Sequence, residues 1–194
     1  DSNIQTLDDL SGHTVSIGAE ESGTERNATQ ILEFAGMPSS LVATKNLDYI
    51  EATKELKAGD IDAFFCTAGL TTTVIDELSK ECDIRLIPLT DTVISKMLES
   101  SLAYTSEVIP AGTYTGQTTD ISTIGVKSVL ITKADVSDDT IEQLTSLLFE
   151  KENEISYSNS LKLELTYDFA TDDIPIPFHD GAKRYYKACG YSTN

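Results

Sequence analysis

The sequence predicts an α/β fold, in which a mostly parallel sheet carries helices on both faces. Through the first half of the chain, short apolar runs alternate with segments whose apolar residues recur at helical spacing, and the links between them are short. Glycines placed after the helical segments, such as Gly36 and Gly59, act as stop signals. A crossover helix must carry the chain back before the next parallel strand can start, so this alternation is typical of a parallel sheet.

The expected elements of the first half alternate along the chain. Strands are expected at residues 15–18, 41–44, 61–65 and 84–89. Helices are expected at residues 24–35, 48–57, 71–79 and 91–100. The runs at 15–18, 61–65 and 84–87 are rich in apolar residues, and we predict that these three strands pair side by side and in parallel.

The second half has a different pattern. Residues 104–109 and 126–132 are expected as strands on either side of a turn-rich segment at 110–116. A helix is expected at 137–150, with Ser137 as its N-cap. A last helix follows a proline-containing extended run near the end of the chain.

Charge and hydropathy exclude several classes of protein. The chain has 14 basic and 32 acidic residues, which gives a formal charge of −18. Such a surface repels phosphate backbones and anionic lipid heads, so no nucleic-acid partner is expected. No apolar run reaches the length of a transmembrane helix, so no membrane insertion of this chain is expected. The chain starts at Asp1 rather than Met, which indicates a processed protein or an excised piece, and a missing targeting segment therefore says nothing about location.

The three cysteines do not form a pattern typical of a disulfide framework. Cys66 follows the strand at 61–65 and Cys82 precedes the one at 84–87, so parallel strands would place these two thiols at opposite ends of the sheet. A disulfide needs Cα atoms roughly 5.5 Å apart. We therefore expect small, buried or half-exposed thiols.

Signatures of catalysis are missing from the sequence. Of the two histidines, His13 lies in an N-terminal turn, and His179 precedes the last helix, where a structural cap is a better interpretation than a catalytic base. No Gly-x-Ser-x-Gly, Walker or His-Glu-x-x-His pattern occurs. We predict no catalytic residue, no metal site and no cofactor, which favours a binding protein over an enzyme.

Two short turns with small residues are predicted to line a ligand site, because each follows the carboxyl end of a parallel strand and precedes a helix. A helix N-terminus leaves backbone N–H groups unpaired, so a small carboxylate or phosphate fits there without a basic side chain. The alternative is that the serine and threonine only cap their helices. An aromatic residue is expected at the edge of the site, where its ring either plugs the base of a loop or contacts the ligand. The predicted ligand-binding residues are Ser22, Gly23, Thr24, Thr67, Ala68, Gly69 and Tyr114.

Four segments, in order along the chain, carry a resemblance to a known family. They are DLSG (9–12) with VSIG (15–18) and SGTE (22–25), GDIDAFF (59–65) with AG (68–69), IPAGTY (109–114) with GQ (116–117), and IPFHDGA (176–182) with YY (185–186). Together they resemble the TAXI-type substrate-binding proteins of TRAP transporters, which are extracytoplasmic receptors for small organic solutes. The segments span nearly the whole chain, and IPAGTY is the most distinctive of them.

The resemblance implies both an architecture and a function. Such receptors have two α/β lobes of the periplasmic-binding-protein type II class, joined by a hinge, with the ligand in the cleft between them. By this likeness, residues 1–121 correspond to the second lobe and residues 122–194 to the return segment, the hinge and the C-terminal helices, while the first lobe lies outside this chain. The implied function is capture of a small organic acid or amino acid, glutamate-like or a dicarboxylate, and its delivery to membrane permease subunits from the periplasm or, as a lipoprotein, from the cell surface. A ligand-sensing or regulatory domain of the same fold is the alternative.

One departure from the family concerns charge. Glu20 and Glu21 stand where the family usually has proline and small residues. Two carboxylates beside an anion site would repel an anion, so they either face solvent or engage an amino group of the ligand.

Overall fold

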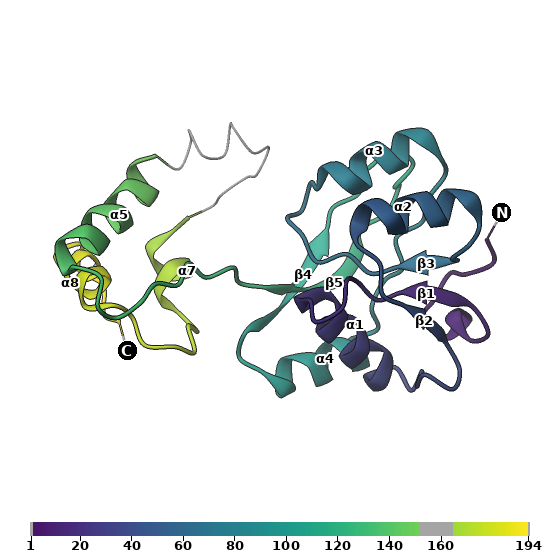
Figure 1. The fold of residues 1–194 in the computed structure, drawn as a ribbon, viewed down its shortest axis with the longest axis horizontal. Coiled ribbons are helices and arrows are strands. Elements are labelled where there is room, and N and C mark those ends of the chain that lie inside the picture. Colours follow the sequence, from purple (N-terminus) through teal and green to yellow (C-terminus); the bar gives the residue numbers. More distant parts are fainter. Residues whose placement is uncertain (1, 152–164, 194) are drawn as a thin grey trace. The chain divides into compact units, whose positions relative to one another are not determined.

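The computed structural model describes residues 2–151 and 165–193, and the chain falls into two compact units, Asp1–Gly125 and Val126–Asn194 (Figure 1). The first unit begins with the short 3-10 helix η1 (Asp8–Leu10) and contains both sheets, whereas the described part of the second unit is helical. The assignment of the two parts to a receptor lobe and a return segment stays a prediction.

Three short strands form the main sheet of the first unit: β1 (Thr14–Ser16), β2 (Ala43–Lys45) and β3 (Ala63–Phe64). Their order is β2-β1-β3, and β1 pairs in parallel with both neighbours. Val15 of β1 lies opposite Ala63 of β3. The predicted parallel sheet is therefore confirmed, and the first three predicted strands each overlap an observed one.

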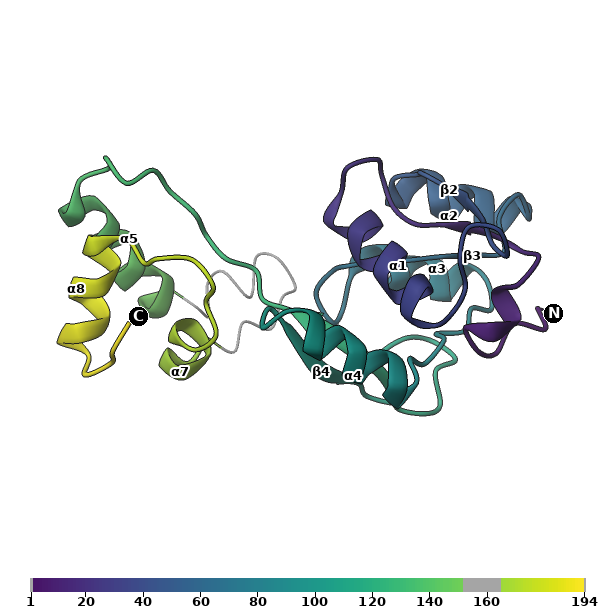
Figure 2. The same ribbon diagram turned by 90° about the horizontal axis from the view of Figure 1, so that it is seen from below.

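Helices cover both faces of this sheet, which confirms the predicted α/β class. They are α1 (Gly23–Phe34), α2 (Tyr49–Ala58), α3 (Thr73–Glu81) and α4 (Asp91–Ser100). In Figure 1, α2 and α3 lie above the sheet and α1 and α4 lie below it, and the view from below in Figure 2 brings α1 and α4 to the front. All four predicted helices are confirmed, with small shifts at the ends of the first three.

The core of the first unit forms where the apolar stripes of α1 and α4 meet the sheet. Ala28, Ile31 and Leu32 are buried on α1, as their helical spacing predicts, and Val93 and Met97 are buried on α4. Burying a large aliphatic side chain contributes about 1.5–3 kcal/mol. These contacts therefore hold α1, and the turn that precedes it, against the sheet.

The predicted strand at residues 84–87 is wrong, because this segment lies outside the assigned strands. The side chain of Arg85 instead donates a hydrogen bond to the carbonyl oxygen of Ile4 at 2.9 Å. Pro88 has no backbone N–H, so the run lacks a donor that a central strand would need. The second neighbour of β1 is β2.

A second, two-stranded sheet contains β4 (Tyr104–Ile109) and β5 (Ile121–Val126). The strand predicted at 104–109 is confirmed, whereas the one predicted at 126–132 is wrong apart from its first residue. The turn between β4 and β5 explains the error. The Gln117 amide nitrogen lies 3.0–3.1 Å from the carbonyl oxygens of Ile109, Pro110 and Thr119, which share its two hydrogens. These contacts close the turn, and pairing resumes at Ile121.

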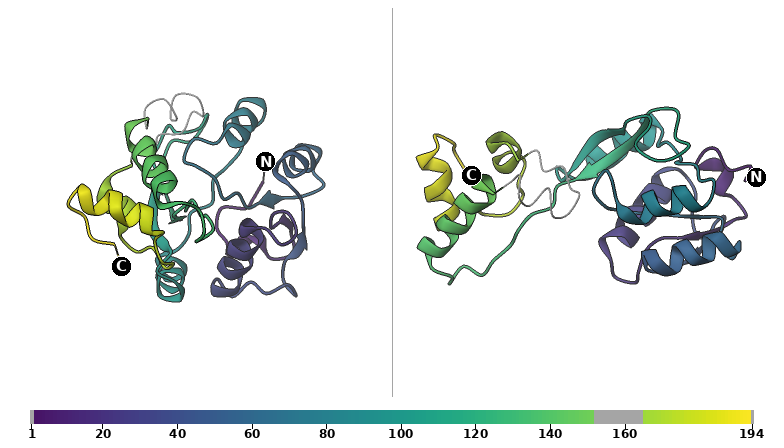
Figure 3. Two further views of the ribbon diagram at one scale, coloured as in Figure 1. Left: turned by 60° about the vertical axis from the view of Figure 1, so that its left-hand side comes forward. Right: turned by 90° about the horizontal axis from the view of Figure 1, so that it is seen from above.

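In the second unit, α5 (Asp138–Glu150) packs against α8 (Asp180–Ala188), as Figures 1 and 3 show. The N-terminal ends of these two helices approach very closely. A Cβ atom at position 181 would lie 2.2 Å from the carbonyl oxygen of Asp138. Gly181 is therefore needed for this contact, since any larger residue would push the helices apart.

Aromatic rings fill the space between α5, α7 (Tyr167–Thr171) and α8. The Phe149 ring stacks on Tyr167 with centroids 4.4 Å apart, and Tyr167 stacks on Tyr191 at 4.8 Å. Tyr186 meets Phe149 edge-on at 6.0 Å. Aromatic pairs of this kind contribute about 0.5–1.5 kcal/mol beyond the area that they bury. The second unit therefore has an aromatic core of its own.

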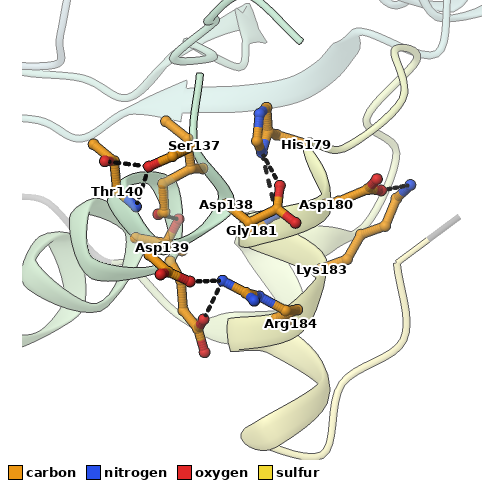
Figure 4. Close-up of polar contacts among 12 residues, drawn as sticks. Ser137, Asp138, Asp139, Thr140, His179, Asp180, Gly181, Lys183 and Arg184 are labelled. Carbon is orange, nitrogen blue, oxygen red and sulfur yellow. Dashed lines mark hydrogen bonds and ion pairs between the residues drawn. The ribbon is translucent and has the colours of Figure 1, made fainter. Parts of the chain in front are cut away.

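Side chains cap α5 and α8 at their N-terminal ends (Figure 4). Ser137 Oγ accepts the N–H of Thr140 at 3.2 Å, and His179 Nδ1 accepts the N–H of Gly181 at 3.1 Å. Both predicted caps are confirmed. The His179 side chain is 9% exposed, and its Nε2 atom has no hydrogen-bond partner among the residues that the structure describes. Its Nδ1 atom is the acceptor that caps α8.

We expect His179→Ala to lower the free energy of unfolding by about 1–2 kcal/mol, because the N–H of Gly181 loses its acceptor. Asparagine is a strong cap and offers a side-chain oxygen in the same place, so His179→Asn should keep most of the stability. Urea unfolding followed by circular dichroism measures both variants. Equal losses for alanine and asparagine would contradict the capping role.

Candidate functional site

The start of α1 is held by a cap and by a close backbone approach. Ser22 Oγ accepts the N–H of Glu25 at 3.1 Å, so Ser22 is the N-cap. Gly18 has a φ of +101°, and a Cβ atom there would lie 2.7 Å from the Cβ of Thr24. Thr24 is only 7% exposed. Gly18, two residues after β1, therefore makes room for the Thr24 side chain.

Tyr49, the first residue of α2, joins the two predicted turns. Its hydroxyl oxygen lies 2.7 Å from Thr24 Oγ1 and 2.9 Å from the carbonyl oxygen of Thr67, and it accepts the N–H of Thr67 at 3.1 Å. Thr24 follows β1 and Thr67 follows β3, so both turns lie at the same edge of the sheet. We refer to Thr24, Tyr49 and Thr67 as the Tyr49 cluster.

No sequence motif predicts a role for Tyr49 in the site. The local signal is a capping box, in which Asp48 accepts the N–H of Glu51 at 2.8 Å and so makes Tyr49 the first helical residue. What places the phenol beside Thr24 is the position of β2 next to β1. That neighbour relationship was not predicted, since residues 84–87 were expected in the sheet instead.

Two asparagines extend the network around the Tyr49 cluster. Asn27 on α1 donates to Thr67 Oγ1 at 3.2 Å and accepts from the Tyr104 hydroxyl at 2.8 Å. Asn46, which follows β2, donates to the carbonyl oxygen of Gly18 at 3.0 Å. Side chains therefore cross-link the segments that leave β1, β2 and β3 at this edge.

The other predicted residues lie nearby but differ in exposure. Three of them are exposed on the same two turns: Gly23, Ala68 and Gly69. Tyr114 is 7% exposed, and its hydroxyl donates to the carbonyl oxygen of Leu70 and accepts the N–H of Thr72. Burial raises the pKa of Tyr114, so the phenol keeps the proton that it donates. Its ring fills the base of the loop, which was one of the two expected roles.

Acidic side chains dominate the surface before and along α1. Glu20 and Glu21 are exposed, and Glu21 has a φ of 61°. A shallow groove of about 700 Å³ runs over this surface and contains Ser22, but no other predicted ligand-binding residue. Its lining consists of Glu21, Ser22, Glu25, Arg26, Thr29, Gln30 and Glu33. Three carboxylates against one guanidinium make this groove unsuitable for an anion.

Within residues 2–151 and 165–193, no group of three or more His, Cys, Asp or Glu side chains is arranged to hold a metal ion. In the same part of the chain, none of the helices has the length and apolar character needed to cross a membrane. His13, the second histidine, lies 3.2 Å from a carboxylate oxygen of Asp62.

The chain is similar to a known protein family and to a solved structure. Residues 1–190 match the NMT1-like family. The periplasmic aliphatic sulphonate binding protein SsuA from Escherichia coli aligns with 97% of this chain at 16% sequence identity and a TM-score of 0.41. The alignment covers 59% of the SsuA chain, so the present chain spans little more than half the length of that protein.

We expect Gly18→Ala to lower the free energy of unfolding by about 2–4 kcal/mol, because a methyl group would combine an unfavourable φ with a clash against Thr24. Gly12 is a matched control, since its φ is +82° but no other described residue comes within 4 Å of a Cβ atom there. Gly12→Ala should cost only about 1–2 kcal/mol. Thermal unfolding compares the two, and equal losses would contradict a close approach at Gly18.

Cys66 precedes Thr67 in the second turn, and burial raises the pKa of its thiol to about 11. The thiol therefore stays protonated near neutral pH, where alkylation needs the thiolate. We expect iodoacetamide to modify the exposed Cys189 well before Cys66 at pH 8, and the Cys66 rate to keep rising as the pH approaches 11. Peptide mass spectrometry measures both rates. Equal rates at pH 8 in the folded protein would contradict the burial of Cys66.

Proposed function

The chain belongs to the NMT1-like family, and from that premise we propose that it is a periplasmic solute-binding protein. Its role is to capture a small organic acid or amino acid and to deliver it to membrane permease subunits. The observation that carries the proposal is the Tyr49 cluster, which brings two turns from the carboxyl ends of β1 and β3 into one group. Small ligands bind at this edge in open α/β sheets.

The ligand-binding surface that we propose consists of both turns. Its members are Ser22, Gly23, Thr24, Thr67, Ala68 and Gly69. Tyr114 supports the second turn through hydrogen bonds with the backbone of Leu70 and Thr72. Thr67 is exposed, and its Oγ1 accepts from Asn27, so the Thr67 hydroxyl proton is available to a ligand. Each such hydrogen bond contributes on the order of 1 kcal/mol.

The proposal also names the type of transporter. The four sequence motifs favour a TAXI-type receptor of a TRAP transporter, with a glutamate-like amino acid or a dicarboxylate as solute. The same likeness places the protein in the periplasm or, as a lipoprotein, on the cell surface. In such a receptor this chain would supply one face of a cleft between two lobes.

Binding, rather than catalysis, is the proposed activity. Both histidines have structural contacts, because His13 pairs with Asp62 and His179 caps α8. Burial disfavours the Cys66 thiolate, which would be needed for nucleophilic attack.

Native mass spectrometry of the protein purified from its host should detect a retained small solute, and titration calorimetry should show binding of L-glutamate or of a dicarboxylate of similar length. Thr67→Val should weaken that binding by about tenfold with little loss of stability, because it removes one exposed hydroxyl. Thr113→Val is the matched control, since the Thr113 hydroxyl bonds to Pro110 in the turn between β4 and β5. The proposal would be contradicted if the purified protein retained no solute and bound neither amino acids nor dicarboxylates.

A further inference from the structure

The hydrogen atoms of the Tyr49 cluster can be assigned from its contacts. The phenol of Tyr49 has one hydrogen, and the carbonyl oxygen of Thr67 at 2.9 Å can only accept. The N–H of Thr67 donates to the phenol oxygen at 3.1 Å. All three contacts are satisfied only when Thr24 donates its hydroxyl hydrogen to Tyr49 across the 2.7 Å contact. Thr24 then offers lone pairs, and no hydrogen, to anything else.

We propose that Tyr49 is a specificity-determining residue, because it fixes the Thr24 hydroxyl as a hydrogen-bond acceptor in the binding site. The inference rests on the proposed function and deepens it. A ligand group that meets Thr24 must donate a hydrogen, so the site favours a solute with an amino group over one that presents only carboxylates. Tyr49 acts through Thr24, and it is therefore a positioning residue for this selectivity.

The charges around α1 support the same selectivity. Glu20 and Glu21 are exposed in the loop before the helix, and the carboxylate of Glu25 accepts hydrogen bonds from the N–H of Glu21 and from Asn46. This acidic surface attracts an ammonium group and repels a carboxylate. The acceptor role of Thr24 and the acidic surface thus both favour a solute with an amino group.

The test compares L-glutamate with glutarate, which differ only in the amino group, by calorimetry of the protein and its variants. We expect the wild-type protein to bind L-glutamate at least about tenfold more tightly than glutarate. Tyr49→Phe frees the Thr24 hydrogen, so the ratio of the two affinities should fall to within about threefold. Tyr167→Phe is the control, because it also removes a hydrogen-bonded phenol, in the second unit, and should leave the ratio unchanged.

A second pair of variants covers the case in which Tyr49→Phe does not fold. Thr24→Ser keeps the hydroxyl, so the ratio of the affinities for L-glutamate and glutarate should stay high. Thr24→Val removes the hydroxyl, so that ratio should fall to within about threefold. Without ligand, the unfolding equilibria of Thr24→Val, Tyr49→Phe and the double variant should show coupling of about fivefold, as expected for a direct hydrogen bond.

The outcomes separate the inference from the proposed function. An unchanged ratio in folded Tyr49→Phe or in Thr24→Val, or no coupling between the two positions, would overturn the inference while solute binding stands. A wild-type protein that binds neither compound would overturn the proposed solute class, and the inference with it, before any variant is compared.

Discussion

The parallel pairing of β1 with both β2 and β3 is the constraint on which the rest of the first unit depends. Parallel strands that share one sheet end at the same edge, so three segments far apart in sequence leave the sheet together. The strands are short, and the helices hold them in place. Buried residues of α1 and α4 press against one face, while α2 and α3 cover the other (Figure 1). This packing therefore fixes where the three segments leave the sheet.

At that edge the phenol oxygen of Tyr49 connects the two turns that follow β1 and β3. Tyr49 contacts both Thr24 and Thr67, and Asn27 and Asn46 add bonds to the neighbouring segments. Each of these hydrogen bonds contributes only about 0.5–1.5 kcal/mol, but together they fix the directions in which hydrogens point. Direction matters more than strength here, because a binding site discriminates between solutes by which partner donates and which accepts.

Helices and caps could be predicted from the sequence, because their signals are local. The periodic residues Ala28, Ile31 and Leu32 face the core as expected, and Ser137 and His179 cap the helices that follow them. Strand neighbours depend on long-range pairing, and there the predictions for residues 84–87 and 126–132 were wrong. A parallel sheet could be predicted, but the order of its strands could not.

The candidate site shows the same division. Thr24 and Thr67 could be singled out because each stands in a small-residue turn after a strand. Tyr49 was missed, since only the position of β2 beside β1 brings it to them. Whether Thr24 donates or accepts depends on that missed contact, so the proposed selectivity rests on the tertiary structure rather than on the turn itself.

A crystal structure of the protein with the solute that it retains from its host tests this account most directly. The account predicts that the solute lies at the strand-end edge, with a donor group within about 3 Å of Thr24 Oγ1. It also predicts that the contacts of Tyr49 with Thr67 persist in the complex. A solute seated in the acidic groove over α1, with no contact to Thr24 or Thr67, would contradict it.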